Sequence, residues 1–207
     1  MLAGCSAARS ASTTSHPVTT SSSSAAPAAR ATVTPSATGS LSQGLLGVLP
    51  VPAGARPLPT NSKGLMNLKS YVQWAYNKTV WTEGMATNAR RGFVAAVRQG
   101  WDNADGTAQE ITLARFATRT GATSALDEVI SDFKQEPKPV TMLADPAIGA
   151  VGWSSPRLDS QGYCEVEIVA AIGDTMIVAI ESTAATPDPA AAKMLLQEQY
   201  DRLKNGS

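Results

Sequence analysis

The clearest alternation of apolar and polar positions lies in the segment 91–133. Apolar residues recur at every second position in two runs that flank Asp105-Gly106, and the second run spans about residues 109–118. A period of two is typical of β-strands, and Asp-Gly favours a tight hairpin turn because both of its positions tolerate positive φ. We therefore predict a β-hairpin. One face of its first strand is expected to carry Phe93, Ala95, Val97 and Trp101.

Directly after this hairpin the apolar residues recur in steps of three and four, which predicts an amphipathic helix. Thr120 or Thr123 is expected to cap its start, and Pro137 prevents it from continuing. The apolar face of this helix consists of Ala122, Ala125, Leu126, Val129, Ile130 and Phe133.

Two further helices are predicted, one before the hairpin and one at the end of the chain. The first begins near Gly64 with Asn61 or Ser62 as its cap, and Trp81 follows it in a short connection. The last begins after Pro187, because Pro is tolerated in a first turn. Their apolar faces consist of Leu65, Leu68, Tyr71, Val72, Ala75 and Tyr76 in the first, and of Ala192, Leu196, Tyr200 and Leu203 in the last.

The strands of the C-terminal half show a similar alternation. Short strands are expected over residues 140–143 and 148–153, and a second hairpin turns at Gly173-Asp174. In its first strand Glu165 and Glu167 alternate with apolar positions. The first interpretation is that the two glutamates lie on a solvated face of the sheet, and the alternative is that they form an acid/base pair or a cation site. The alternating apolar residues are Cys164, Val166, Ile168 and Ala170, followed by Met176, Val178 and Ile180.

These elements predict an α+β fold, in which helices pack on an antiparallel sheet of about five or six strands. The predicted globular domain spans residues 45–205. Residues 6–44 are rich in Ser, Thr, Ala and Pro. Such a segment buries too little apolar surface to offset the entropy cost of ordering, so we predict a disordered tether.

The extreme N-terminus carries a short motif of its own. Leu2-Ala3-Gly4-Cys5 resembles the lipobox of bacterial lipoproteins, in which the cysteine thiol receives a diacylglyceryl group. This resemblance implies that Cys5 is lipidated and that residues 1–5 are the remnant of a signal peptide. Met1 directly precedes the motif, so two alternatives stay open: the native start lies upstream of Met1, or the match arises by chance. The resemblance also implies a membrane partner, reached through the lipid anchor.

The domain itself resembles the extracytoplasmic domains of actinobacterial lipoproteins. The motifs that carry this resemblance are an Arg-Gly-Phe start and an Asp-Gly-Thr turn in the first hairpin, an Ala-Arg-Phe-x-Thr strand end, and the stretches GATSALDEV and GAVGW. The layout is similar to the PsbP/Mog1-like α/β/α sandwich. The resemblance implies a location on the outer face of the cytoplasmic membrane, or secretion, more than it implies an activity.

Several chemistries are excluded by composition. The single histidine, His16, lies in the predicted tether, so the domain has no imidazole base for a Ser or Cys triad and no His/Cys zinc set. There is no phosphate-binding or dinucleotide-binding glycine motif. The 17 basic and 17 acidic side chains give no net field to attract nucleic acid. We therefore expect no catalytic residue, metal or cofactor; a hydrolase using carboxylates alone is the alternative.

Aromatic residues suggest where a ligand binds. Trp81, Trp101 and Trp153 are candidates to line a pocket with Arg157 and Tyr163, and the alternative is that they belong to the core. Cys164 is expected to be a buried, inert thiol. The sequence thus favours a non-catalytic binding or interaction module that takes an apolar small ligand or an envelope protein. The alternative is a sensing or accessory subunit of a cell-envelope system.

Overall fold

The computed structural model describes residues 47–59, 64–135, 141–156 and 162–206. The lipobox and the whole of the predicted tether lie outside these residues, as do Asn61, Ser62, Pro137 and Arg157. Within the described parts the chain forms an α+β fold, and the predicted fold class is confirmed. The sheet has eight strands instead of the expected five or six.

All strand pairs in the sheet are antiparallel. The order is β1-β3-β4-β8-β7-β6-β5, with β2 also paired to β3, so the last hairpin lies between the first hairpin and β6. The strands are β1 (Arg56–Pro57), β2 (Gly64–Met66), β3 (Phe93–Asp102), β4 (Ala108–Phe116), β5 (Thr141–Asp145), β6 (Ala150–Ser155), β7 (Cys164–Ile172) and β8 (Thr175–Thr183).

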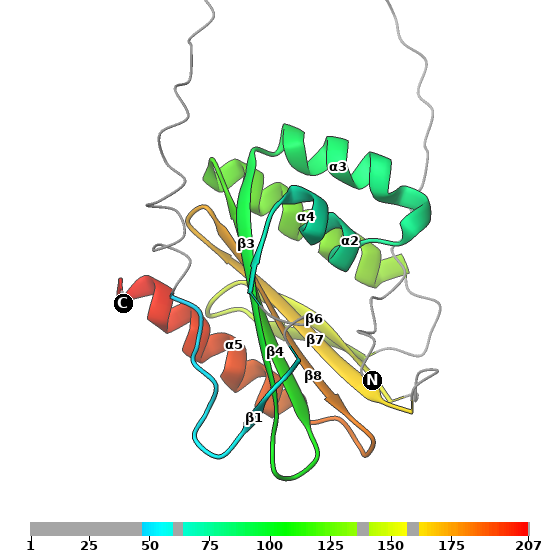
Figure 1. Ribbon diagram of the computed structural model, residues 1–207, viewed down its shortest axis with the longest axis vertical. Helices are drawn as coiled ribbons and strands as arrows, with labels where there is room; N and C mark the ends of the chain where they lie inside the picture. The colour runs from blue at the N-terminus through cyan, green and yellow to red at the C-terminus, as the bar shows by residue number, and fades with distance from the viewer. Residues whose placement is uncertain (1–46, 60–63, 136–140, 157–161, 207) are drawn as a thin grey trace, which may run out of the picture.

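Helices cover both faces of the sheet. Figure 1 shows α2 (Leu68–Ala75), α3 (Trp81–Arg90) and α4 (Arg119–Gln135) gathered at one end of the sheet, with α5 (Pro189–Lys204) on the opposite face. A short 3-10 turn, η2 (Lys78–Val80), leads into α3. Because both faces are covered, alternating positions along the central strands are buried on either side.

Two apolar clusters follow from this arrangement. The helix face of the sheet, which is the face under α2 and α4, carries a cluster that includes Phe116, Val129 and Trp153. The α5 face carries the other, with Ile111 and Leu196 among its fully buried members. The predicted apolar stripe of the last helix is confirmed, because Ala192, Leu196, Tyr200 and Leu203 all pack into this second cluster.

The segment before α2 differs from the prediction. Gly64–Met66 is an edge strand paired with β3, and Leu65 is exposed instead of lying on a helix face. The helix begins at Leu68, and its cap is Asn67, whose side chain accepts a hydrogen bond from the Ser70 N–H at 3.0 Å. The short connection predicted around Trp81 is also wrong, since Trp81 is the first residue of α3.

The first hairpin forms as predicted, with two corrections of detail. The register of β3 against β4 shifts between Phe93 and Ala95, so Phe93 packs with the helix-face cluster while Ala95 and Val97 pack on the α5 face. In the turn, Gly106 alone of the Asp105-Gly106 pair has positive φ, at 86°. The Asp105 carboxylate instead accepts hydrogen bonds from the N–H and hydroxyl of Thr107.

The start of α4 lies against the chain that precedes β3. Thr118, and not Thr120 or Thr123, caps this helix: its hydroxyl accepts a hydrogen bond from the Gly121 N–H at 3.1 Å. A Cβ at Gly121 would collide with the Arg91 carbonyl oxygen. Glycine at this position therefore lets α4 approach the hairpin closely.

Candidate binding site on the helix face of the sheet

Polar side chains are buried on the helix face of the sheet, in a row that runs from β3 into the apolar cluster under α4. Arg98 on β3 lies opposite Thr112 on β4, and Gly100 lies opposite Glu110 two residues away. Arg98 donates to the Glu110 carboxylate, and both side chains are largely desolvated, with 14% and 10% of their surface exposed. The guanidinium carbon of Arg98 also lies 5.4 Å from the centre of the Trp74 ring, a cation–π distance.

The strand register extends this group across the sheet. Glu110 pairs with Ile180 on β8, Ile180 with Glu167 on β7, and Glu167 with Trp153 on β6. Side chains at paired positions of neighbouring strands point to the same face. We call this group the polar site; it consists of Arg98, Glu110, Thr112, Glu167, Ile180 and Trp153.

Four atoms of the polar site are buried and have no hydrogen-bond partner: Arg98 Nε, Glu110 Oε1, Thr112 Oγ1 and Trp153 Nε1. Most buried polar groups in proteins are paired, and an unpaired one costs about 1–3 kcal/mol. Among the described residues, the only other such atom is Asn88 Oδ1. Unsatisfied hydrogen-bonding capacity is thus concentrated in one part of the sheet.

The electrostatics of the polar site centre on Glu110. Burial raises the pKa of this carboxyl, while the hydrogen bond and positive charge of Arg98 lower it. The nearby Thr112 hydroxyl also lowers the pKa, although its geometry does not make a full hydrogen bond. The net direction is upward, so the folded protein favours the neutral form of Glu110 more than water does.

Glu165 and Glu167 do not lie on a solvated face, which corrects the first interpretation of their alternation. Glu167 is 6% and Glu165 8% exposed, and each takes part in a polar interaction. The pattern misled because it assumes that one side of a strand is wet, whereas β7 lies in the middle of a sheet with helices on both faces.

The structure separates the residues that were predicted to line one pocket. Trp153 belongs to the polar site, but Trp101 lies on the α5 face, where its indole N–H donates to Gln109 Oε1 at 3.1 Å. Trp81 begins α3, and its indole donates to the Tyr76 carbonyl oxygen at 3.0 Å. Tyr163 is half-buried just before β7, and Arg157 lies outside the described residues.

Sequence reasoning missed Arg98, Glu110, Thr112 and Trp74. A two-residue turn at Asp105-Gly106 would pair residue 98 with 113 and 100 with 111, but the observed register is shifted by one residue and pairs 98 with 112 and 100 with 110. Only with this observed register do the polar residues of the two strands face each other as a buried polar pair. The other residues of the polar site, on β8, β7 and β6, join this pair only because β8 lies next to β4. The period of apolar residues does not predict which strands are neighbours.

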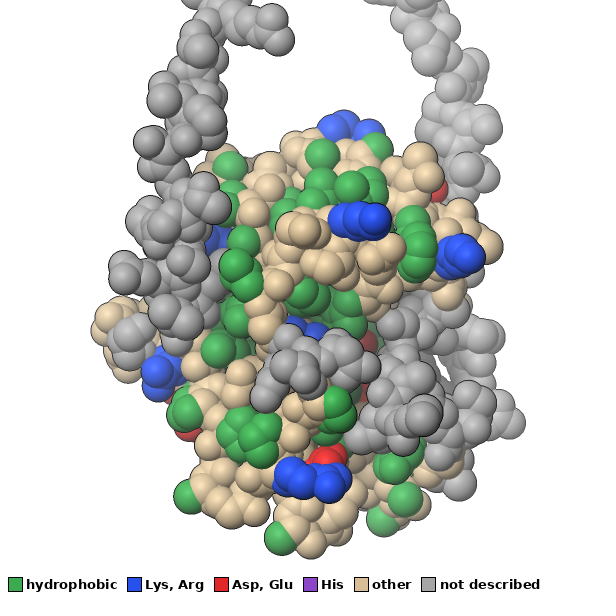
Figure 2. Space-filling view, viewed as in Figure 1, with side chains coloured by type: hydrophobic (Ala, Val, Ile, Leu, Met, Phe, Trp, Pro, Cys, Tyr) green, Lys and Arg blue, Asp and Glu red, His purple; other side chains and the backbone are tan. Residues whose placement is uncertain are grey.

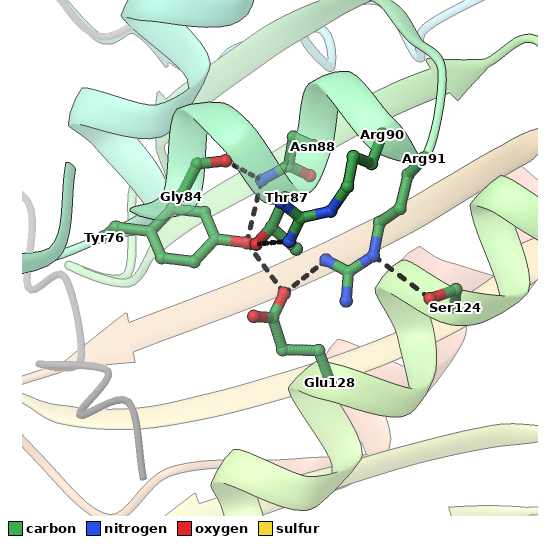
Figure 3. A network of polar contacts seen from close by, with 8 residues as sticks. All are labelled: Tyr76, Gly84, Thr87, Asn88, Arg90, Arg91, Ser124 and Glu128. Atoms are coloured by element: carbon green, nitrogen blue, oxygen red, sulfur yellow. Dashed lines mark hydrogen bonds and ion pairs between the residues drawn. The ribbon is translucent and has the colours of Figure 1, made fainter. Parts of the chain in front are cut away.

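A second polar network holds the helices over the other part of this face (Figure 3). The Tyr76 hydroxyl donates to Glu128 on α4 at 2.8 Å and accepts from the Asn88 amide on α3 at 3.0 Å. Arg91 donates to the same Glu128 carboxylate at 2.5 Å and to the Ser124 hydroxyl at 3.1 Å. These bonds link α2, α3 and α4, so the helical layer beside the polar site is fixed in place.

The α5 face has a buried carboxyl of its own. Glu181 is 2% exposed and accepts hydrogen bonds from the Asp188 N–H and the Gln109 amide. Burial is the main cause that raises the pKa of Glu181, and these two hydrogen bonds oppose it. Since Asp188 caps α5, Glu181 connects the sheet to the start of that helix.

The described residues add little that points to other chemistry. They contain no group of three His, Cys, Asp or Glu side chains placed to hold a metal ion. Cys164 is free and buried, as predicted, and its thiol lies 3.2 Å from the Pro156 carbonyl oxygen. On the face seen in Figure 2, Lys and Arg side chains are dispersed and do not form one patch.

No helix in the described parts of the chain has the length and hydropathy needed to span a membrane. No family model matches the sequence, and no curated protein is significantly similar to it. Among solved structures, the extracellular domain of PknH from Mycobacterium tuberculosis matches with a TM-score of 0.51 and 9% sequence identity. The match covers 81% of this chain and 92% of that chain. The chain therefore shares its fold with an extracellular domain.

Proposed function

We propose that this chain is a non-catalytic binding module that works outside the cytoplasmic membrane and is held at its outer face by a lipid on Cys5. The observation that carries the proposed location is the fold match, because it extends over 92% of a domain that is itself extracellular, while the proposed lipid rests on the Leu2-Ala3-Gly4-Cys5 motif. A match of that extent means that the two domains correspond over nearly their whole length and do not merely share one motif. The same match fits a sensing or accessory role in a cell-envelope system.

The chemistry of the site supports binding over catalysis. Glu110, the carboxyl with the strongest signs of a special environment, is already engaged by Arg98. The only histidine of the chain is His16, far in sequence from the polar site. A site that has hydrogen-bonding atoms to spare, but no imidazole base and no reactive thiol, is suited to hold a ligand.

The test of this proposal is where the protein goes and what Cys5 carries. The gene, with its upstream sequence, is expressed in an actinobacterial host, and the mature protein is recovered from membrane and soluble fractions for intact-mass analysis. We expect membrane-bound protein that begins at Cys5 with a diacylglyceryl group. Cys5→Ser should release the protein from the membrane, while Cys164→Ala, which removes the other cysteine, should leave it anchored.

An unmodified N-terminus at Met1 in the cytosolic fraction would contradict both the anchor and the location. Protein that is exported but carries no lipid would contradict the anchor alone.

A further inference from the structure

We propose that the polar site binds an uncharged oligosaccharide through its hydroxyl groups. This inference rests on the proposed binding function and adds the chemical class of the ligand. It starts from the four unpartnered atoms of the polar site, which lie on side chains whose residues are buried: Thr112 is 1%, Glu110 7% and Trp153 7% exposed. Arg98 and Glu110 keep a small exposed fraction, so the site reaches solvent at that end.

The types of these atoms define what a ligand must offer. Arg98 Nε and Trp153 Nε1 are donors that need acceptors, whereas Glu110 Oε1 accepts and the Thr112 hydroxyl does both. A hydroxyl group donates and accepts through a single oxygen, so a ligand rich in hydroxyls satisfies all four in several arrangements.

The charges of the polar site point to a neutral ligand. The positive charge of Arg98 is matched by the Glu110 carboxylate, and its guanidinium lies over Trp74. Glu167 also has a polar interaction already. What the site lacks is therefore hydrogen bonds. A strongly charged ligand would compete with the Arg98–Glu110 pair, at the cost of leaving one buried charge unmatched.

The extent of the polar site indicates more than one sugar ring. Glu110 on β4 and Trp153 on β6 are three strand spacings apart, which is about 14 Å at ~4.8 Å per strand. Ile180 lies between them in the same row, and Trp153, whose ring packs edge-on against Phe133 of α4, ends it. Apolar side chains set between hydrogen-bonding groups suit a sugar chain, because its rings present C–H faces between their hydroxyls.

The first experiment is a calorimetric titration of the full chain with maltotriose and with triacetylchitotriose as neutral probes. Trialanine, which offers amides, and trigalacturonate, which is charged, serve as comparison probes. We expect at least one neutral trisaccharide to bind, and neither comparison probe to bind as tightly. Thr112→Val and Trp153→Phe should each weaken binding about three- to tenfold, as expected for one lost hydrogen bond.

The second measurement separates a role in binding from a role in folding. Thr112→Val replaces a buried hydroxyl that makes no full hydrogen bond, so the ligand-free variant should unfold at a higher temperature than the wild type. The matched control is Thr183→Val, because the Thr183 hydroxyl accepts a hydrogen bond from the Ala185 N–H at 3.1 Å. This control should unfold at a lower temperature and bind the saccharide normally.

Three results would overturn the inference. The first is that neither neutral trisaccharide binds, which would mean that the site holds water only. The second is that trialanine or trigalacturonate binds more tightly than both neutral trisaccharides. The third is that Thr112→Val lowers the unfolding temperature as Thr183→Val does. Lipid on Cys5 together with failed saccharide binding would leave the proposed location standing. Saccharide binding without lipid would refute the anchor and leave the ligand class standing.

Discussion

Buried carboxyl groups decide how the stability of this domain depends on pH. Burial raises the pKa of both Glu110 and Glu181 from the ordinary value of 4.5. A raised pKa means that the folded state binds a proton more tightly than the unfolded state does. Each group therefore contributes fully to the free energy of unfolding below pH 4.5, and the contribution is lost as the pH rises through the folded-state pKa.

Glu181→Gln tests this effect on the α5 face, away from the polar site. Glutamine has the same shape but does not titrate, so the fall in the free energy of unfolding above pH 4.5 should be shallower than in the wild type. Urea unfolding at a series of pH values measures it. Asp105→Asn is the control, because hydrogen bonds from Thr107 lower the pKa of Asp105. The contribution of Asp105 to the free energy of unfolding is therefore lost only as the pH falls below 3.8, so this variant should leave the slope above pH 4.5 unchanged. An unchanged slope in Glu181→Gln would show that Glu181 ionises in the folded protein as it does in water.

Single residues also show where sequence reasoning reached its limit. Cys164 was correctly predicted to be buried, because alternation in β7 places it with Val166 and Ile168. The same alternation gave the wrong environment for Glu165 and Glu167, since period alone does not reveal whether the second face is covered. To predict that Arg98 and Glu110 form a buried pair, one must know the register of the hairpin as well as the period of its apolar residues.

At the scale of elements, the strongly periodic segments were predictable and the weakly periodic ones were not. Both hairpins, α4 and α5 form where the pattern placed them. The helix α3 was missed because its buried positions are Gly84 and Asn88, which a hydrophobic period cannot detect. The edge strand β2 lies where the pattern predicts the start of a helix, because Leu65 continues the apolar spacing of α2.

The segment before β1 is held on α5 by a glutamine that acts as a backbone partner. Gln199 is fully buried; its carbonyl accepts from the Leu49 N–H at 2.8 Å, and its amide donates to the Gly47 carbonyl oxygen at 3.0 Å. Arg202 donates to the same Gly47 oxygen at 2.9 Å. Residues 47–49 are therefore held against the C-terminal half of α5.

Gln199→Leu should release this segment. The variant leaves the Leu49 N–H without its partner, at a cost of about 1–3 kcal/mol. Hydrogen exchange followed by mass spectrometry should show faster exchange over residues 47–55, while β7 and β8 stay protected. Gln197→Leu is the control, because Gln197 on the same helix donates to Asp201 on the surface at 2.9 Å and makes no hydrogen bond to the other described residues. Equal exchange in the two variants would show that Gln199 does not hold the segment.

At the scale of the whole molecule, the two ends of the helix face are built differently. Three helices, tied together by the Tyr76–Asn88–Glu128 network, cover one end with apolar contacts. The other end keeps a buried ion pair and three polar atoms without partners, on Arg98, Glu110 and Thr112, while the fourth such atom, Trp153 Nε1, lies on a ring that packs against Phe133 of α4. The first end stabilises the fold. The second lowers stability, which is the expected signature of a site kept for a ligand.

This division leads to a test of the Arg98–Glu110 pair. If the pair serves a ligand and not the fold, replacing both residues with apolar ones of similar length should not destabilise the domain, because a buried ion pair is often no more stable than an apolar substitute. Removing one partner alone is different, since it leaves the other charge buried and unmatched.

The most direct measurement is the free energy of unfolding of Arg98→Met, Glu110→Met and the double variant, compared with the wild type by urea unfolding. We expect each single variant to lose about 3–5 kcal/mol. The double variant should equal or exceed the wild type in stability, with saccharide binding abolished. A double variant as unstable as the two single losses combined would contradict the account, because it would show that the pair is there to hold the fold together.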